Sequence, residues 1–277
     1  MIYGFLYFNS SGSDIHGDSG ATGSRMIPIN LTGREFLPKG GDSDIVHHAY
    51  YTVGYNPKKE IPDWVAYKLT KESLVVKNVP RAKRFIVDND VEGKSAKHSD
   101  YTHSGYTRGH MAPAGDMAFS EEAMRESFYM SNMTPQLRAF NGGIWRELEE
   151  NVRDWAYDND ELYIVSGPIF YDDKIDKIGK STQVAVPDAF YKAILDIEGR
   201  SQKSIGFIIP HEKSDKHLRE YAVSIDEVER VANLNFFNDL IQDNNEEEQL
   251  EQSMDVNKWR VDKKRFNQRV SHWNKEK

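Results

Sequence analysis

The sequence predicts a mixed α/β (α+β) domain built on a largely antiparallel sheet. Segments with the apolar–polar alternation of strands and segments with helical periodicity follow one another along the chain. They do so without the regular strand–helix repeat that is typical of a parallel sheet. The tetrapeptide Asn56-Pro57-Lys58-Lys59 has the composition of a turn and joins two strand-like segments. Together these observations predict one domain that mixes strands and helices.

Five segments are predicted to be strands. Residues 64–70 alternate apolar and polar side chains, and residues 162–167 form a short apolar run that ends at Gly167-Pro168. The five segments are residues 50–55, 64–70, 162–167, 184–197 and 204–209.

Two helices are predicted from a cap signal and from spacing. Ser120 precedes Glu121 and Glu122, so a capping hydroxyl is followed by acids that suit the positive end of a helix. In residues 141–157, apolar side chains recur at the spacing of one helix face. These side chains are Ile144, Trp145, Leu148, Val152 and Trp155. We therefore expect both tryptophans in the core and not in a platform for stacked bases.

The chain is expected to hold one domain, residues 42–277, preceded by a flexible extension. Residues 1–41 are rich in Gly, Ser and Asp, a composition typical of loosely packed segments. The apolar opening lacks a basic n-region and is too short for a complete signal peptide. No stretch approaches the ~20 apolar residues that a membrane helix requires, so no membrane span is expected.

Composition limits the chemistry. The hydrophobic share of 38% is typical of a folded protein, and 277 residues are enough to bury a core. The chain has no cysteine, which excludes disulfides, thiolate catalysis and cysteine-ligated zinc. The absence of cysteine does not define the compartment.

The net charge of −8 argues at first against a polyanionic substrate. The charge is unevenly distributed, however. Residues 239–255 carry seven acids and no base. This run is consistent with a solvated loop, which is the favoured interpretation, or with a cover that mimics phosphate over a cleft. A region of locally positive charge lies earlier, at Lys77, Arg81, Lys83, Arg84, Lys94, Lys97 and Arg108.

The tripeptide Arg108-Gly109-His110 is the first candidate for a site. A strand end would present both side chains to a cleft, and the glycine would let a substrate approach the backbone. A neutral imidazole suits the activation of water, and a guanidinium suits a phosphate whose charge grows in the transition state. Taken alone, the tripeptide is more often a surface histidine beside a salt-bridging arginine.

The motifs that follow change this balance. Ser131-Asn132-Met133-Thr134-Pro135-Gln136 precedes a segment that runs from Asn141-Gly142-Gly143 through Glu149. With Arg108-Gly109-His110 they closely resemble the ββα-metal family of DNA/RNA non-specific endonucleases. The resemblance runs from about Tyr55 to Gly167-Pro168 and more thinly to Phe237. It implies a central antiparallel sheet flanked by helices, with a ββα-metal (His-Me finger) active site.

The resemblance also implies residue roles. His110 would be the general base, and Asn141 the sole direct protein ligand of one Mg²⁺, for which Mn²⁺ can substitute. Arg108 would stabilise the transition state, and Glu149 would hold metal-bound waters. On an ideal helix Glu149 lies ~12 Å along the axis from Asn141, which favours contact through water.

Other positions are less defined by the resemblance. For phosphate contacts, Arg81, Lys83 and Arg84 lie where the family carries a functional arginine, and the three cannot be aligned uniquely with it; Arg81 and Arg84 are the candidates. Thr107 stands where the family usually has Asp, which leaves the role of that position open. We expect Asn132 and Gln136 to be buried polar supports. Asp116 fits a structural and a functional role equally.

Two histidine groups are expected to lie outside the site. His98, Asp100 and His103 form a metal-like spacing in a turn-rich segment, where surface polar residues are more common. His47 and His48 point to opposite faces of a strand and do not make a site together.

The resulting hypothesis is a magnesium-dependent endonuclease that cuts DNA and RNA with little sequence preference and leaves 5′-phosphate ends. Two alternatives stay open: an inactive nucleic-acid-binding module on the same fold, and a phosphodiesterase for small nucleotides. Because such an enzyme is hazardous in its own cytoplasm, we expect secretion, a periplasmic location or a protein inhibitor. The preferred polymer, the formation of a homodimer and the biological role are left open by the sequence.

Overall fold

The computed structural model describes residues 36–91, 95–172, 174–180, 182–199, 201–241 and 244–275. Strands alternate irregularly with helices along this part of the chain. The strands are β1 (Asp44–His47), β2 (Thr52–Asn56), β3 (Ile61–Thr70), β4 (Tyr106–His110), β5 (Met133–Leu137), β6 (Glu161–Ile169), β7 (Lys177–Ile178), β8 (Val184–Ala185), β9 (Ala189–Asp196), β10 (Lys203–Pro210) and β11 (Ala222–Val223). The helices are α1 (Lys71–Val75), α2 (Glu121–Ser127), α3 (Arg146–Asn159), α4 (Ile225–Ala232), α5 (Asn244–Gln252) and α6 (Lys263–Ser271). Short helical turns are η1 (His98–Tyr101), η2 (Met130–Asn132), η3 (Phe140–Trp145), η4 (Leu218–Tyr221), η5 (Val256–Lys258) and η6 (Trp273–Lys275).

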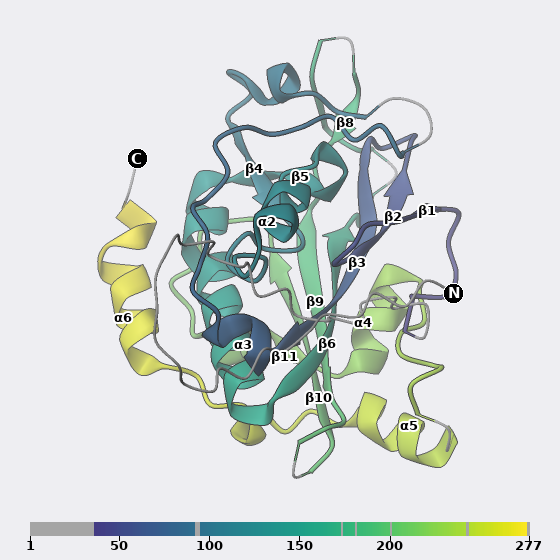
Figure 1. The fold of residues 1–277 in the computed structure, drawn as a ribbon, viewed down its shortest axis with the longest axis vertical. Helices are drawn as coiled ribbons and strands as arrows, with labels where there is room; N and C mark the ends of the chain where they lie inside the picture. The colour runs from purple at the N-terminus through teal and green to yellow at the C-terminus, as the bar shows by residue number, and fades with distance from the viewer. Residues whose placement is uncertain are drawn as a thin grey trace, which may run out of the picture.

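A seven-stranded sheet forms the centre of the described chain (Figure 1). Its strand order is β1-β2-β3-β6-β9-β10-β11, and every neighbouring pair is antiparallel. Two small ribbons, β4–β5 and β7–β8, lie outside it. The predicted α+β class with an antiparallel sheet is confirmed.

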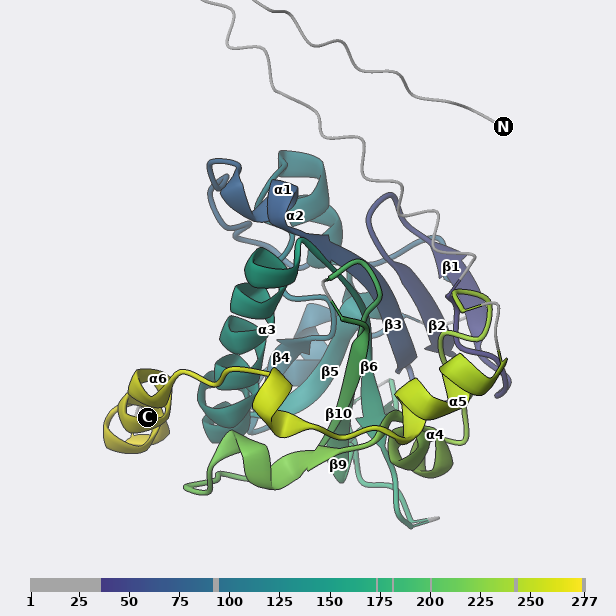
Figure 2. The same cartoon turned by 90° about the horizontal axis from the view of Figure 1, so that it is seen from below.

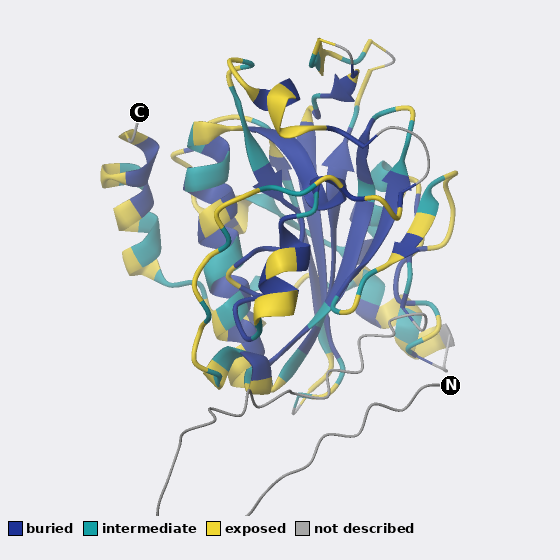
Figure 3. Cartoon of the chain, turned by 45° about the horizontal axis from the view of Figure 1, so that its top comes forward, coloured by how far each residue is buried: buried dark blue, intermediate teal, exposed yellow. Residues whose placement is uncertain are grey.

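Helices cover both faces of the sheet (Figure 2). Side chains alternate along β3, so that Val65 and Tyr67 join one core while Trp64 and Ala66 join the other. The first core packs under α3, and the second packs under α4 and α5. Trp145 and Trp155 are buried in the first core, as their spacing predicts. The central strands are accordingly almost wholly buried (Figure 3).

Most predicted elements are confirmed. Four of the five predicted strands correspond to β2, β3, β6 and β10, and Ser120 caps α2 through a bond from the backbone N–H of Ala123. The fifth, residues 184–197, is instead two strands, β8 and β9, separated by residues 186–188. Pro187 explains the break, because proline has no N–H to offer a strand ladder.

The helix predicted over residues 141–157 begins differently from an ideal helix. Its first part, η3, is a wide helical turn in which Gly143 has non-helical dihedral angles (φ −103°, ψ −111°). Regular α-helix starts only at Arg146. The ideal-helix separation between Asn141 and Glu149 therefore does not apply, because a kink lies between them.

The ends of the described chain pack on the body. Phe36 is 3% exposed and belongs to the core beneath α4, so packing begins before residue 42. The rest of the predicted extension, residues 1–35, lies outside the described residues. At the other end, α6 lies outside α3 (Figure 2). None of the helices in the described ranges has both the length and the apolarity needed to cross a membrane.

Candidate active site

The ribbon β4–β5 positions His110. His110 is the last residue of β4 and pairs with Met133 at the start of β5. Gly109 faces the buried Gln136, and a Cβ on Gly109 would lie 2.0 Å from Cδ of that side chain. The expectation that this glycine admits substrate is therefore wrong, since the space beside it is already filled by Gln136.

His110 is buried among aromatic rings. Its imidazole packs edge-on against Phe128, with ring centroids 4.8 Å apart, and is 5.9 Å from the ring of Phe85. Burial, with a smaller contribution from the charge of Arg81, lowers the pKa of His110 to about 3. The ring is thus neutral near pH 7, the state in which an imidazole accepts a proton. Its Nε2 has no hydrogen-bond partner among the described residues.

Asn141 lies in η3, between β5 and α3. Its side-chain Nδ2 donates a hydrogen bond to Oγ1 of Thr107 over 2.9 Å. Thr107 in turn donates to the carbonyl of Gln136 over 2.8 Å. Asn141 is therefore held by the same ribbon that carries His110, although the two residues are 31 positions apart in the sequence.

Glu149 lies one turn into α3 and is partly buried. Burial raises the pKa of Glu149 to about 7, and the nearby cations Arg153, Lys192 and Arg81 oppose that rise. A carboxylate in this position needs positive charge nearby to remain ionised.

These side chains meet at one cavity of about 260 Å³. Polar and charged groups form much of its wall. The lining residues are Arg81, His110, Pro113, Ala114, Gly115, Asn141, Gly142, Arg146, Glu149, Glu150 and Arg153. The predicted base, metal ligand and carboxylate are thus brought together with Arg81.

The donor set fits a hard divalent cation. Asn141 and Glu149 offer oxygen atoms, the ligands that Mg²⁺ prefers. Because Thr107 engages the amide nitrogen of Asn141, the amide oxygen is the remaining polar atom of that side chain. Mg²⁺ keeps several of its own waters, so few protein oxygens are enough.

Arg108 and Arg84 do not line the cavity. The guanidinium of Arg108 donates to the carbonyl of His98 over 2.8 Å, and its Cζ lies 5.2 Å from the ring centre of Phe85 and 5.3 Å from that of Tyr101. Arg84 is exposed. Of the arginines singled out from the sequence, Arg81 is the one at the cavity wall.

Three cations near the site were missed from the sequence. Arg146 and Arg153 line the cavity from α3, at helical spacing from Glu149. Their spacing from Glu149 could have identified both arginines from the sequence. Lys192 on β9 is fully buried, and its Nζ lies 5.1 Å from the ring centre of Trp145. No pattern pointed to Lys192, because it interrupts an otherwise apolar strand.

Three of the remaining polar candidates have structural partners, whereas the amide of the buried Gln136 has no hydrogen-bond partner among the described residues. Asn132 is fully buried and exchanges hydrogen bonds with both backbone atoms of Ala112, and Asp116 accepts from Tyr67 (2.9 Å) and Arg153 (2.8 Å). Asp100 caps η1 by accepting from the backbone N–H of Lys97.

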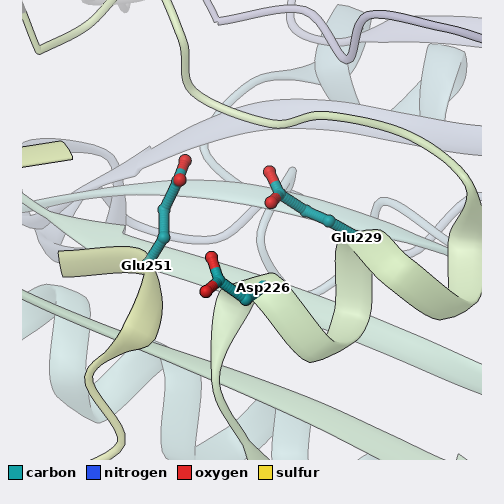
Figure 4. A group of neighbouring side chains, drawn as sticks. All are labelled: Asp226, Glu229 and Glu251. Carbon is teal, nitrogen blue, oxygen red and sulfur yellow. The ribbon is translucent and has the colours of Figure 1, made fainter. Parts of the chain in front are cut away.

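A separate acidic cluster lies at α4 and α5, on the face of the sheet opposite α3 (Figure 2), and its side chains are drawn in Figure 4. Asp226 and Glu229 of α4 and Glu251 near the end of α5 point toward one another, with one oxygen of each within 4.8 Å of the others. The acidic run over residues 239–255 thus includes a helix packed against α4 and β10. In its described part the run is thus largely exposed, as expected, but it is a helix and not a loop, and it lies across the sheet from the cavity beside α3.

Comparison with known proteins agrees with this geometry. The family model for DNA/RNA non-specific endonucleases matches residues 32–243. The solved structure of an endonuclease G in complex with its inhibitor superposes with a TM-score of 0.67 at 33% identity, covering 73% of this chain and 88% of that one. The fold and the finger-like β4–β5–α3 site define a ββα-metal nuclease architecture.

Sequence relatives agree as well. The chain is 35% identical over 212 residues to the mitochondrial nuclease EXOG of Xenopus laevis, covering 72% of this chain but 58% of that protein. It is 34% identical over 221 residues to nuclease C1 of Cunninghamella echinulata var. echinulata, covering 74% of this chain and 87% of the relative. The chain belongs to the DNA/RNA non-specific endonuclease family.

Proposed function

We propose that the chain is an endonuclease that hydrolyses phosphodiester bonds of DNA and RNA with little sequence preference. One observation carries the proposal: a neutral, buried His110 shares a single cavity with the oxygen ligands Asn141 and Glu149. A base for water and a place for a cation are the parts that metal-assisted phosphodiester hydrolysis requires.

In the proposed reaction, His110 accepts a proton from water while the water oxygen forms a bond to phosphorus. The bond from phosphorus to the 3′-oxygen breaks in line with the attack. A solvent proton completes the leaving hydroxyl, so the products carry 5′-phosphate and 3′-hydroxyl ends. Mg²⁺ or Mn²⁺, held directly by Asn141 and through water by Glu149, would neutralise charge on the phosphate and the leaving oxygen.

Cations near the cavity support the binding of a phosphate backbone. Arg81 is proposed to contact a phosphate oxygen at the cavity wall, and the exposed Arg84 is proposed to meet the backbone farther out. Arg108, two residues before His110 on β4, is proposed to add positive potential for the charge that develops at phosphorus. Contacts of this kind carry no sequence information, which is consistent with low specificity.

A nuclease assay with matched variants tests the proposal. Plasmid DNA and RNA are incubated with Mg²⁺, with Mn²⁺ and with EDTA, using wild type, His110→Ala and His272→Ala. We expect both polymers to be cut by wild type with metal, a loss of at least about 100-fold for His110→Ala, and no loss for the exposed His272→Ala. Intact polymers with wild type and either metal would contradict the proposal and favour an inactive binding module. Cleavage of dinucleotides alone would favour a small-nucleotide phosphodiesterase.

The family context also suggests a partner. The endonuclease G of the similar solved structure is bound by an inhibitor protein. We propose that this chain is likewise restrained by an inhibitor or kept apart from cellular nucleic acid by export.

A further inference from the structure

Thr107 departs from the acidic residue that the family usually carries before Arg108-Gly109-His110. It lies on β4 opposite Gln136 of β5. Its Oγ1 lies 2.8 Å from the carbonyl oxygen of Gln136 and 2.9 Å from Nδ2 of Asn141. One hydroxyl thus joins both strands of the ribbon to Asn141 in η3.

The single hydroxyl proton decides the direction of both bonds. A carbonyl oxygen can only accept, so the proton of Thr107 is used on Gln136. The other contact must then have Oγ1 as the acceptor, and the donor must be the amide nitrogen of Asn141. With the amide reversed, two oxygen acceptors would face each other with no proton between them.

We propose that Thr107 is a positioning residue that fixes the amide of Asn141 with its oxygen turned toward a divalent cation. The inference rests on the proposed metal role of Asn141. An asparagine presents either end of its amide with nearly the same shape, and only the oxygen end can ligate Mg²⁺. Thr107 removes that ambiguity before the cation arrives.

The neutral hydroxyl has an advantage over a carboxylate in this chain. An ionised Asp at position 107 could accept from Asn141, but it has no proton for the carbonyl of Gln136. It would set a negative oxygen against that carbonyl. Threonine makes both bonds, so the usual acidic residue is not needed to orient Asn141.

Metal affinity of the substrate-free protein tests this role. Binding of Mn²⁺ is followed by the loss of the free-ion electron paramagnetic resonance signal for wild type, Thr107→Val, Thr107→Ser and Asn141→Ala. Losing a group that orients a ligand typically weakens metal binding 10- to 100-fold, so we expect the dissociation constant to rise about tenfold in Thr107→Val. Thr107→Ser keeps the hydroxyl and is expected to bind within about twofold of wild type.

Thr134→Val is the matched control for the ribbon. Thr134 is buried on β5, and its hydroxyl lies 3.5 Å from the carbonyl of Gly109, also across the ribbon. Its loss removes a hydroxyl-to-carbonyl contact of the same kind and should leave Mn²⁺ affinity unchanged. Melting temperatures in EDTA identify any variant with a disturbed fold. In that case Thr107→Ala, which removes the hydroxyl without adding a methyl group, is expected to show the same tenfold weakening.

The outcomes separate the two proposals. Weak binding by Asn141→Ala with wild-type affinity in Thr107→Val would overturn the positioning role alone. Wild-type affinity in Asn141→Ala would overturn the metal role of Asn141 and this inference with it. Equal weakening in Thr107→Val and Thr134→Val would also overturn it, because ribbon stability would then explain both.

Discussion

Arg81 lies at the cavity wall, unlike Arg84 and Arg108. It lines the cavity, and its charge reaches both His110 and Glu149. Burial lowers the pKa of Arg81, which indicates a guanidinium partly removed from water, where its charge acts more strongly. Both Arg81 and Arg84 are exposed over much of their surface, but Arg84 does not line the cavity.

At this scale we predict that Arg81→Met lowers kcat/KM on duplex DNA about 100-fold, the usual cost of losing a charge aimed at a transition state. Arg84→Met is the matched control and should lose only about a few-fold, because Arg84 lies outside the cavity, where solvent and salt screen its charge. Steady-state kinetics at a fixed ionic strength make the comparison. Equal losses of kcat/KM in the two variants would contradict a specific role for Arg81 in the transition state.

The second residue-scale prediction concerns protonation of His110. Burial holds its pKa at about 3, below the usual 6.5, so the ring stays neutral as pH falls from 7 and becomes charged only in strong acid. Nuclear magnetic resonance of the imidazole carbons should therefore show no His110 titration between about pH 5 and pH 8. A His110 midpoint near 6.5 would contradict the buried geometry. Arg81→Met should move the His110 midpoint upward, because one cation is removed.

The sequence was sufficient to identify His110, Asn141 and Glu149 as candidates, because their spacing resembles a family pattern. It was not sufficient to choose Arg81 over Arg84, since the choice depends on how the segment before Phe85 turns against Phe128. Lys192 had no signal at all, because its neighbours in space come from β3 and η3. The hydrogen bond between Thr107 and Asn141 could not be predicted from the sequence either, because it joins residues that meet only in the folded protein.

At the scale of elements, α4 and α5 meet through like charges. Burial and the neighbouring carboxylates raise the pKa of Glu229 to about 7 and that of Glu251 to about 8, from the usual 4.5. Between pH 4.5 and these raised pKa values, the folded protein binds more protons than the unfolded chain. The free energy of unfolding therefore falls as pH rises through this range. The stabilising effect of these protons is fully present below about pH 4.5 and is lost as pH rises through the folded values.

Glu251→Gln is therefore expected to stabilise the protein at alkaline pH. Removing the negative charge should raise the melting temperature by about 2–4 °C near pH 8.5, with a smaller effect near pH 5.5, where the wild-type carboxyl is already protonated. Glu212→Gln, at an exposed position away from the cluster, is the control. A pH-independent shift would mean that the carboxyl is ionised throughout.

Element prediction succeeded where the local pattern determined the structure. The apolar strands and the Ser120 cap carry their signals within a few residues. The start of the helix after Asn141 carries no such local signal. Its first part, η3, is distorted at Gly143, and Asn274 lies against that glycine. A Cβ at Gly143 would lie 2.7 Å from Oδ1 of Asn274. No local pattern can report a contact with a residue so distant in the sequence.

At the scale of the whole molecule, residues 263–275 brace the site from outside. Arg269 and Glu147 are both fully buried and form an ion pair, and Arg269 also donates to the carbonyls of Ser214 and Lys216. Trp273 lies under Arg146, with 4.0 Å between Cζ and the ring centre. These contacts hold the first turn of α3, which carries Glu149.

We predict that Arg269→Leu lowers the free energy of unfolding by about 3 kcal/mol, because it leaves the carboxylate of Glu147 buried without its partner. Urea unfolding measures the change. Lys264→Leu, an exposed substitution on the same helix, should change it by less than about 0.5 kcal/mol. A similar cost for both variants would show that α6 contributes through its general packing and not through the buried ion pair.

The ion pair between Arg269 and Glu147 also joins residues that are 122 positions apart. During translation, β4, β5 and α3 leave the ribosome well before the segment that braces them. Domains form as their chain emerges, and contacts between distant positions close last. The nascent chain therefore carries every proposed catalytic side chain for some time before the support for α3 exists. Full assembly of the site is expected to be among the final events in the folding of this protein.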